Sequence, residues 1–441
     1  MLYLVTKPNK LHKKLRNNKT TDVLTIGFAL FAMFFGAGNL LLPPLIGVKV
    51  GSAFWIAIFA FGLTGILLPF TGILAVVKSG ETFRDLSARV NRNLGVLLGS
   101  VIMICIGPLI AIPRTAATTY EVGIKPFFGE LHPIIPSILF FAITLFLSIK
   151  PSKIVDVIGN YLTPVLLVLL AVLIVVGIVN PQAATQATQQ DFATSFSYAF
   201  SEGYQTLDVM ASVIFAGIII SAAKQKGYTD IKSKIQVVVF SGLLAVLSLL
   251  FVYGGLIYLG ASSGVDNPEI KRSELLITIA HNILGKYGLI AIALTMAFAC
   301  LTTAIALATS FGTFFSEISK GKLKYEFLVV FCCIISLILS VFGVDAIINF
   351  AYPPLAFVYP ITITLVLYQL FFGHKITAKA PYVGAMIGAS IISLLSVLKI
   401  LGLLSASTLE RLDSIPLFAM DLGWVLPSLI GFILGFLFRK K

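Results

Sequence analysis

The amino-acid sequence predicts an all-α polytopic membrane protein, and two observations support this prediction. Of its 441 residues, 58% are hydrophobic and 12% are charged, whereas soluble globular chains have about 45 to 50% apolar and about 25% charged residues. Apolar runs of about 20 residues recur from Val23 to Phe438, and a helix of that length crosses a hydrocarbon core of about 30 Å. Unbroken runs such as Leu162 to Val179 exclude an outer-membrane barrel, whose strands alternate apolar and polar residues in segments of about 10.

Twelve helices are expected from the apolar runs that lie between charged or Pro/Gly-rich breaks. They cover residues 23–48, 51–77, 95–120, 134–149, 158–179, 193–222, 235–260, 287–315, 326–343, 345–372, 381–403 and 421–438. No long polar stretch interrupts this pattern. An appended catalytic domain is therefore not expected.

The Lys and Arg residues predict the orientation of these spans. If the N-terminus is cytoplasmic, 24 of the 32 Lys and Arg residues fall at the two termini or in inside loops, and 8 fall outside or in the membrane. Because short cytoplasmic loops carry the excess of Lys and Arg, both termini are expected in the cytoplasm. The same residues account for the net charge of +13, so the expected partner is the lipid bilayer and not nucleic acid.

The first and sixth spans contain segments that are poor at continuing a helix. Gly36-Ala37-Gly38-Asn39 lies about 20 Å into the first span at about 1.5 Å per residue, and Ser201 to Asp208 places two acids and a glycine in the sixth. Irregular backbone at this depth persists only where it is buried in protein or lines a polar cavity. For either segment taken alone, the alternative is that its glycines only let the helix pack closely against its neighbours.

The two broken spans are five apart, and an odd offset means that the second enters from the opposite side. The sequence therefore predicts a 5+5 inverted repeat with broken helices 1 and 6, unwound at residues 36–39 and about 202–206, plus two peripheral helices. The expected divisions are a basic cytoplasmic N-terminus (1–22), a first five-helix repeat (23–179), a second, inverted repeat (193–372), two peripheral helices (381–438) and a basic cytoplasmic C-terminus (439–441).

Broken helices suggest a site for a zwitterion, because one half-helix ends in free N–H groups and the other in free carbonyls. We expect the amides around Ala37, Gly38 and Asn39 to receive a carboxylate, and carbonyls near Glu202 to receive an ammonium. Arg114 is expected nearer the outer face, so backbone groups and not charged side chains would hold the substrate. The full set of candidate substrate residues is Gly36, Ala37, Gly38, Asn39, Ser201, Glu202, Gly203 and Tyr204. Candidates for an apolar lining are Phe34, Phe35, Ile112 and Tyr204.

The eighth span contains a possible cation site. The hydroxyls of Thr302 and Thr303 and the carbonyl of Ala299 are oxygen ligands that suit a small hard cation, and carbonyls of Ala32 and Phe35 could complete the shell. The alternative is that the threonines bond back to their own helix. Asp208 is a candidate for protonation, or it could cap the second half of helix 6.

At these residues the chain resembles the bacterial branched-chain amino acid:cation symporters, also called LIVCS or branched-chain amino acid transport system II carriers, of the amino acid-polyamine-cation superfamily. The resemblance spans nearly the whole chain. It rests on Phe34-Phe35-Gly36-Ala37-Gly38-Asn39-Leu40 with Pro43-Pro44, Gly107-Pro108 with Pro113-Arg114-Thr115-Ala116, Glu202-Gly203-Tyr204-Gln205-Thr206-Leu207-Asp208, and Tyr352-Pro353-Pro354 with Tyr359-Pro360.

The resemblance implies uptake of leucine, isoleucine and valine across the bacterial cytoplasmic membrane, coupled to Na⁺ or, in some members, to H⁺, without an organic cofactor. More distant relatives of the same fold hold sodium between helices 1 and 8 with an Ala-x-x-Thr-Ser/Thr pattern, which Ala299, Thr302 and Thr303 match. On that basis these three residues, with Ala32 and Phe35, are the expected cation site.

Other functions predict features that differ from those of this chain. A twelve-helix major-facilitator transporter has a long basic central loop, whereas 223–234 is basic but short. A channel would need a filter loop, for which the sequence offers no candidate. A membrane enzyme would need clustered His, Asp or Glu near one face, and ATP-driven transport would need a nucleotide-binding motif; the chain has neither. We therefore expect a secondary transporter and not an enzyme.

Overall fold

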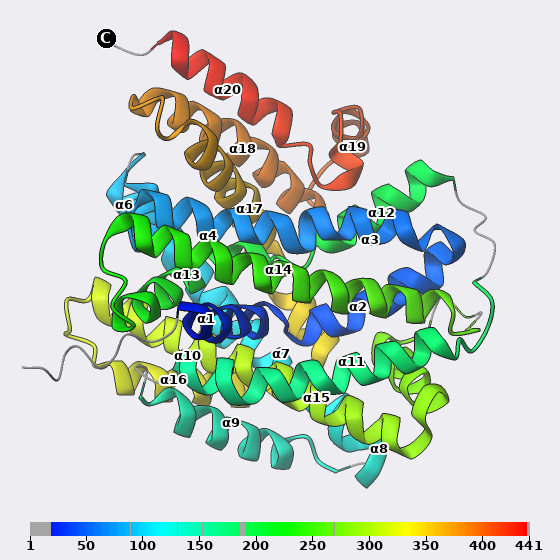
Figure 1. Ribbon diagram of the computed structural model, residues 1–441. Coiled ribbons are helices and arrows are strands. Elements are labelled where there is room, and N and C mark those ends of the chain that lie inside the picture. The colour runs from blue at the N-terminus through cyan, green and yellow to red at the C-terminus, as the bar shows by residue number, and fades with distance from the viewer. Residues whose placement is uncertain are drawn as a thin grey trace, which may run out of the picture.

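The computed structural model describes residues 19–88, 90–129, 131–150, 154–185, 191–265, 267 and 270–438. The expected basic termini, apart from residues 19–22, lie outside these residues. In the described part every regular element is helical, which confirms the predicted fold class (Figure 1). Eight helical stretches there are long and apolar enough to cross a membrane, and three shorter apolar helices accompany them.

The first five expected spans are all helical, and several are divided by short turns. They are α1 (Lys19–Phe34) with α2 (Ala37–Val50); α3 (Phe54–Gly62) with α4 (Leu68–Ser79); α6 (Arg92–Ile104), α7 (Ala111–Thr118) and α8 (Lys125–Phe128); α9 (Ile134–Ser148); and α10 (Ile154–Val157) with α11 (Thr163–Val179). A short helix α5 (Phe83–Ser87) connects the second span to the third, and π-helical turns join α3 to α4, α6 to α7, α7 to α8 and α10 to α11.

The remaining spans follow in the predicted order. They are α12 (Phe192–Tyr204) with α13 (Asp208–Gln225); α14 (Ile231–Ala261); α15 (Arg272–Ile318); α16 (Tyr325–Ser340); α17 (Val344–Phe372); α18 (Lys379–Ile400); and α20 (Val425–Leu437), preceded by the short α19 (Ala406–Asp413). One expected boundary is wrong, because the outside loop before the eighth span contains the first part of α15. This part is set off from the rest by Gly285, whose φ of 56° lies in the left-handed region that favours glycine.

The broken first span lies at the centre of the molecule, where α14 packs along both of its halves (Figure 1). Glycines make the contact of α14 with α2 close. A Cβ atom on Gly47 would stand 1.9 Å from the carbonyl oxygen of Ile257, and one on Gly260 would stand 2.0 Å from that of Pro44. Small residues at such contacts let helix backbones approach, which favours association inside a membrane.

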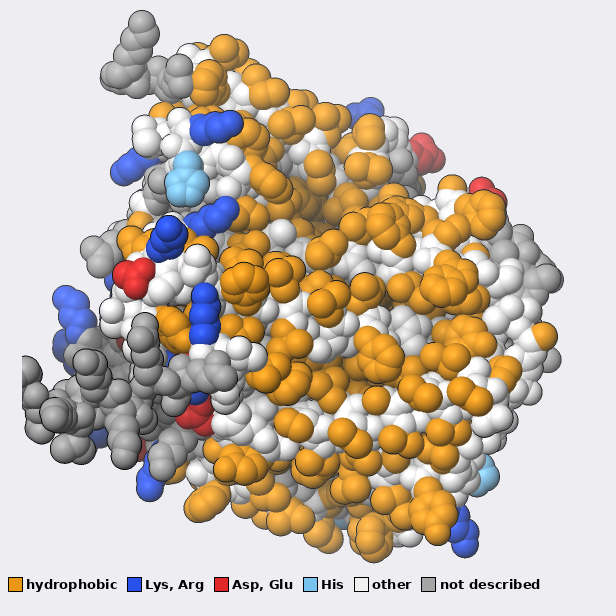
Figure 2. Space-filling view, viewed as in Figure 1, with side chains coloured by type: hydrophobic (Ala, Val, Ile, Leu, Met, Phe, Trp, Pro, Cys, Tyr) orange, Lys and Arg blue, Asp and Glu red, His pale blue; other side chains and the backbone are white. Residues whose placement is uncertain are grey.

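Helices α18 and α20 lie at one edge of the molecule, as expected for peripheral helices (Figure 1). They pack on each other through glycines, since a Cβ atom on Gly384 would come within 2.1 Å of the Gly431 carbonyl oxygen. The surface has the character of a membrane protein. Figure 2 shows hydrophobic side chains over the middle of the visible face, while most Lys and Arg side chains lie toward one side.

Candidate functional site

The break in the first span is shorter than the sequence predicts. Only Phe35 and Gly36 are non-helical, and α2 already begins at Ala37. Gly36 is extended, with φ −103° and ψ −175°, and its carbonyl accepts the first hydrogen bond of α2. The amides of Ala37, Gly38 and Asn39 therefore form the first turn of α2 and have no acceptor within that helix. The expected donors for a carboxylate are thus present, but as a helix N-terminus and not as an unwound segment.

The break in the sixth span begins three residues later and ends one residue later than expected, at residues 205–207 between α12 and α13. Leu207 has a φ of 61°, a left-handed conformation that is uncommon for a residue with a side chain. Carbonyl oxygens at the end of α12 already accept hydrogen bonds. That of Ser201 accepts from the Gln205 amide at 2.9 Å, and that of Gly203 accepts from the Thr206 hydroxyl at 2.8 Å. The Gly203 oxygen also accepts from the Thr206 amide at 3.4 Å, so an ammonium group here would use the second lone pair of the Ser201 oxygen.

One side chain joins the two breaks. Nδ2 of Asn39 lies 2.6 Å from Oδ2 of Asp208, 2.9 Å from the Phe34 carbonyl oxygen and 2.9 Å from the hydroxyl of Tyr253 on α14. Asn39 is 3% exposed. The sequence predicts a role for Asn39 only through its backbone amide, and Tyr253 lies inside an apolar run without a distinguishing pattern.

Four of the five candidate cation residues come together beside the first break. Oγ1 of Thr302 lies 3.0 Å from the Ala299 carbonyl oxygen and 3.2 Å from that of Ala32, and Oγ1 of Thr303 lies 3.4 Å from the same Ala32 oxygen. A Cβ atom on Gly36 would stand 3.3 Å from Oγ1 of Thr303. The Thr302 hydroxyl therefore bonds both to its own helix and to the end of α1, and the Thr303 hydroxyl bonds to the end of α1. Within the described ranges no cluster of His, Cys, Asp or Glu offers an alternative metal site.

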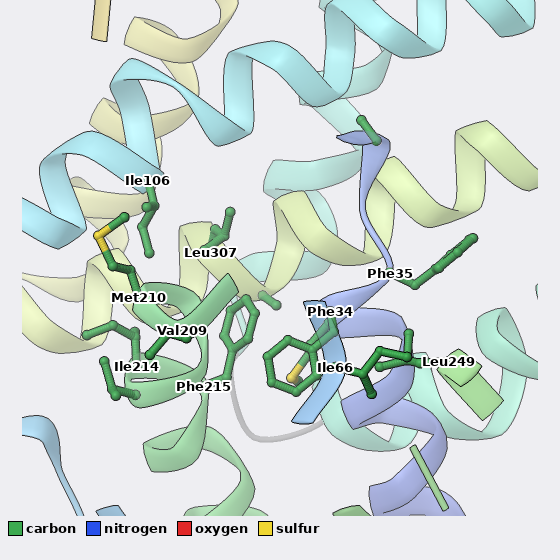
Figure 3. Packing of buried hydrophobic residues seen from close by; sticks show 14 of the residues in the cluster. Phe34, Phe35, Ile66, Ile106, Val209, Met210, Ile214, Phe215, Leu249 and Leu307 are labelled. Atoms are coloured by element: carbon green, nitrogen blue, oxygen red, sulfur yellow. The ribbon is translucent and has the colours of Figure 1, made fainter. Parts of the chain in front are cut away.

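Phe35, the fifth candidate, places its ring between Phe31 and Tyr253, with ring centroids 5.2 and 5.8 Å away. The residues proposed as an apolar lining of the substrate site are packed against other side chains. Phe34 meets Phe215 edge-on at 6.1 Å, and Ile112 is fully buried (Figure 3 shows Phe34 and Phe215).

Tyr204, another candidate, contacts α17 and the segment that leads into α20. Its ring meets that of Tyr359 at 4.7 Å, and its hydroxyl accepts a hydrogen bond of 3.0 Å from Nε1 of Trp424. The peripheral helices thus contact the end of α12, which the sequence pattern did not predict.

A cavity of about 1050 Å³ connects the two breaks to one end of the molecule. Gly38, Asn39 and Glu202 are the candidate substrate residues that line it, and Leu207 lines it from the second break. Its other apolar walls include Leu41, Leu42, Leu45, Ile110, Ile277 and Leu355. It extends to Lys49, Lys125, Lys271 and Arg272, which stand at the helix ends expected outside the cell.

Arg114 lies in this cavity, and its expected position near the outer face is wrong. A Cβ atom on Gly38 would stand 3.0 Å from Nη2 of Arg114, so the guanidinium is beside the start of α2. The cause is a kink in the third span, where Gly107 has the non-helical φ and ψ of −80° and −111°. An estimate of depth from residue count assumes a straight helix, and the kink at Gly107-Pro108 breaks that assumption.

Ion pairs lie at the end of the molecule opposite the one to which the cavity extends. Nζ of Lys226, just after α13, is 3.4 Å from Oδ1 of Asp22 on α1 and 3.1 Å from Oδ1 of Asp156 on α10. The Tyr228 hydroxyl donates a hydrogen bond of 3.0 Å to Asp22. These contacts tie the intracellular ends expected for spans 1, 5 and 6 together, whereas the cavity lies at the other end.

Solved transporter structures share this fold. A structure of Mhp1, a nucleobase-cation-symport-1 family transporter, in a closed conformation with bromovinylhydantoin bound, matches with a TM-score of 0.58 at 14% identity, covering 94% of this chain and 91% of that one. A Na⁺-coupled sialic acid symporter in a substrate-bound outward-open state matches with a TM-score of 0.57 at 13% identity, covering 95% and 90%. These identities establish similarity of fold alone.

Sequence comparisons identify the family. Branched-chain amino acid permease BraB of Bacillus subtilis (strain 168) is 35% identical over 424 residues, covering 94% of this chain and 95% of the relative. Branched-chain amino acid permease BrnQ of the same organism is 34% identical over 433 residues, covering 95% and 98%. The model of the family described as "Branched-chain amino acid transport protein" matches residues 19–441. The chain therefore belongs to the branched-chain amino acid transport protein family, a family of membrane transport proteins and not of enzymes.

Proposed function

We propose that this protein imports leucine, isoleucine and valine across the bacterial cytoplasmic membrane by symport with a cation, through alternating access. The observation that carries the proposal is the meeting of both helix breaks at the Asn39–Asp208 contact, on the wall of a cavity open toward one end. The amides of Ala37 to Asn39 would bind the substrate carboxylate. Carbonyls at Ser201 to Gly203 would bind its ammonium group, and the leucine-rich walls would receive its side chain.

Alternating access would require two groups of helices to move against each other, and the packing of the helices supports such a movement. In spans 1, 2, 6 and 7, α14 packs on α1 and α2, α13 packs on α4, and α12 packs on α3. In spans 3, 4, 8 and 9, α15 packs on α7, α9 and α16. Each group can move as a unit about a midplane site, as in transporters built from inverted repeats. We infer that residues 23–179 and 193–372 are these repeats and that 381–438 are peripheral.

The coupling cation would bind where Thr302, Thr303, Ala299 and Ala32 meet, with Phe35 beside them. The support is that hydroxyl and carbonyl oxygens of helices 1 and 8 converge there, next to Gly36 at the break. A cation bound there would fix the end of α1 relative to α15, and so would couple ion binding to the break that holds the substrate. Na⁺ suits this set of uncharged oxygen ligands, and proton coupling is the alternative that the experiment below distinguishes.

Uptake of labelled leucine into proteoliposomes tests this proposal. An imposed inward Na⁺ gradient should drive accumulation, whereas a pH gradient without Na⁺ should not; the opposite result would assign coupling to H⁺. Accumulation above equilibrium also separates a symporter from a channel. Isoleucine and valine should compete with leucine, because an apolar pocket discriminates between side chains that differ by one methylene by only about 1 to 3 kcal/mol. Lysine and glutamate should not compete.

A double variant tests the cation site. Thr302→Ala with Thr303→Ala should abolish the ion dependence of uptake while the protein still inserts into membranes. The matched control is Thr309→Ala with Ser310→Ala on the same helix, where Ser310 bonds only within α15, to the Ala306 carbonyl oxygen. Unchanged ion dependence in the folded Thr302/Thr303 variant would refute the site.

A further inference from the structure

We propose that Arg114 is a substrate-binding residue that pairs with the carboxylate of the transported amino acid. This inference rests on the proposed function and extends it, since the sequence suggested that backbone groups alone hold the substrate. It assigns a charged, specificity-determining side chain to the site. It predicts that the protein binds compounds with an anionic carboxylate more tightly than analogues that lack it.

The position of Arg114 matches that of a carboxylate bound at the start of α2. Its guanidinium approaches Gly38, where a Cβ atom would stand 3.0 Å from Nη2 and 3.4 Å from Cζ. Gly38 and Asn39 line the same cavity as Arg114. A residue larger than glycine would displace the guanidinium from the helix N-terminus, so the glycine allows the charged group and the free amides to face one ligand.

The guanidinium has unused hydrogen-bonding capacity. Its Nε atom is buried and has no hydrogen-bond partner in the part of the chain that the structure describes. Among the carboxylates that the structure describes, none forms an ion pair with Arg114 within 4.0 Å. Asp208 is near enough to interact electrostatically, but its Oδ2 already accepts the 2.6 Å hydrogen bond from Asn39. An ionisable residue held inside a membrane is costly and is by default a functional candidate, and five N–H donors favour bidentate binding of a carboxylate.

Another lining residue of the cavity suits the other end of a zwitterion. Glu202 lines the cavity from the end of α12, beside the second break, and its Oε2 atom is buried without a hydrogen-bond partner among the described residues. The cavity therefore carries an incompletely bonded cation beside the first break and an incompletely bonded carboxylate oxygen beside the second. An α-amino acid supplies one group of opposite charge to each of these side chains, whereas an amine or a plain carboxylic acid supplies only one.

Two analogues separate carboxylate recognition from general damage to the site. Leucine and leucinol, which lacks the carboxylate, would be compared as inhibitors of labelled-leucine uptake and as stabilisers of the purified protein in thermal unfolding. Arg114→Gln should weaken leucine binding by about 10- to 100-fold, the range for a charged hydrogen bond, and leave the weak leucinol binding unchanged. Arg114→Lys keeps the charge without the bidentate geometry, so it should weaken leucine binding by a smaller factor.

The matched control is Arg411→Gln, which removes an equal charge from an exposed arginine on α19, away from the residues that line the cavity, and should leave the leucine to leucinol ratio unchanged. An unchanged ratio in Arg114→Gln would overturn the inference, as would equal weakening of both compounds. If Arg114→Gln does not fold, wild-type leucine affinity in Arg114→Lys would overturn it. Failure of the proposed function is seen separately, as wild-type protein that binds leucine but does not accumulate it under any ion gradient.

Discussion

Nδ2 of Asn39 in the second half of helix 1 lies 2.6 Å from Oδ2 of Asp208, the first residue of the second half of helix 6. The two residues are 169 positions apart in the chain. Through this contact the two half-helices that are expected to bind substrate are held in one arrangement. A change in the position of either break would therefore change the position of the other.

Replacing Asn39 should destabilise the protein and stop transport. Asn39→Ala removes a donor from the partly buried carboxylate of Asp208, and an unsatisfied buried group costs about 1 to 3 kcal/mol or more when it is charged. The unfolding temperature in detergent and leucine uptake would both be measured. The double variant Asn39→Ala with Asp208→Asn should lose less stability than the sum of the two single variants, because the residues interact directly.

The control for this prediction is Asn160→Ala. Asn160 accepts a 2.8 Å hydrogen bond from the Thr25 hydroxyl, but it is exposed, so its loss should change stability less and leave uptake intact. Strict additivity of the two single variants in the cycle would show that Asn39 and Asp208 do not act together.

Gly36→Ala should weaken cation binding specifically. The new Cβ atom would stand 3.3 Å from Oγ1 of Thr303, and a contact this tight displaces the hydroxyl from Ala32. Overpacking of this kind costs about 1 to 3 kcal/mol, so the half-saturating Na⁺ concentration for uptake should rise about 5-fold or more.

Gly217→Ala is the matched variant, because its Cβ atom would meet only the Glu81 carbonyl oxygen, at an ordinary 3.6 Å. It should keep the wild-type Na⁺ dependence. A Gly36→Ala protein with that same dependence would count against the cation site beside Gly36.

Glu81 lies at the end of the molecule that carries the ion pairs, and its ionisation should make the stability of the protein depend on pH. Hydrogen bonds from Lys224 and Lys234 lower the pKa of Glu81 below its usual range. Because the pKa is lower in the folded state, the stabilisation is present above the unfolded pKa, near 4.3, and is lost as pH falls through the folded pKa. Glu81 is partly exposed, so the contribution is about 0.2 to 1 kcal/mol and weakens with salt.

This prediction can be checked by thermal unfolding of wild type and Glu81→Gln at pH 7 and at pH 3.5, each at low and high salt. The wild type should be the more stable at pH 7, and the difference should shrink at the lower pH. A difference that grows on acidification would contradict the assigned pairing.

Local sequence properties determined the membrane fold. Hydrophobicity over about 20 residues decides whether a segment enters the bilayer as a helix, so the twelve spans could be predicted from the apolar runs. Glycine weakens a helix, and Gly36 lies in the first break, whereas Pro43 and Pro44 lie inside α2 without ending it. The second break contains neither glycine nor proline, and the predicted breaks differ from those of the structure by one to three residues.

Contacts between distant segments were decided only by the tertiary structure. Ala32 and Thr302 are 270 positions apart, and their meeting was expected from a family resemblance and not from composition or spacing. The kink at Gly107 brings Arg114 to Gly38, and no local property of α7 specifies which helix its side chain will face. Side-chain partners of this kind depend on how curved and broken helices pack together, since hydrophobicity specifies that a helix is buried in the membrane but not which neighbour it contacts.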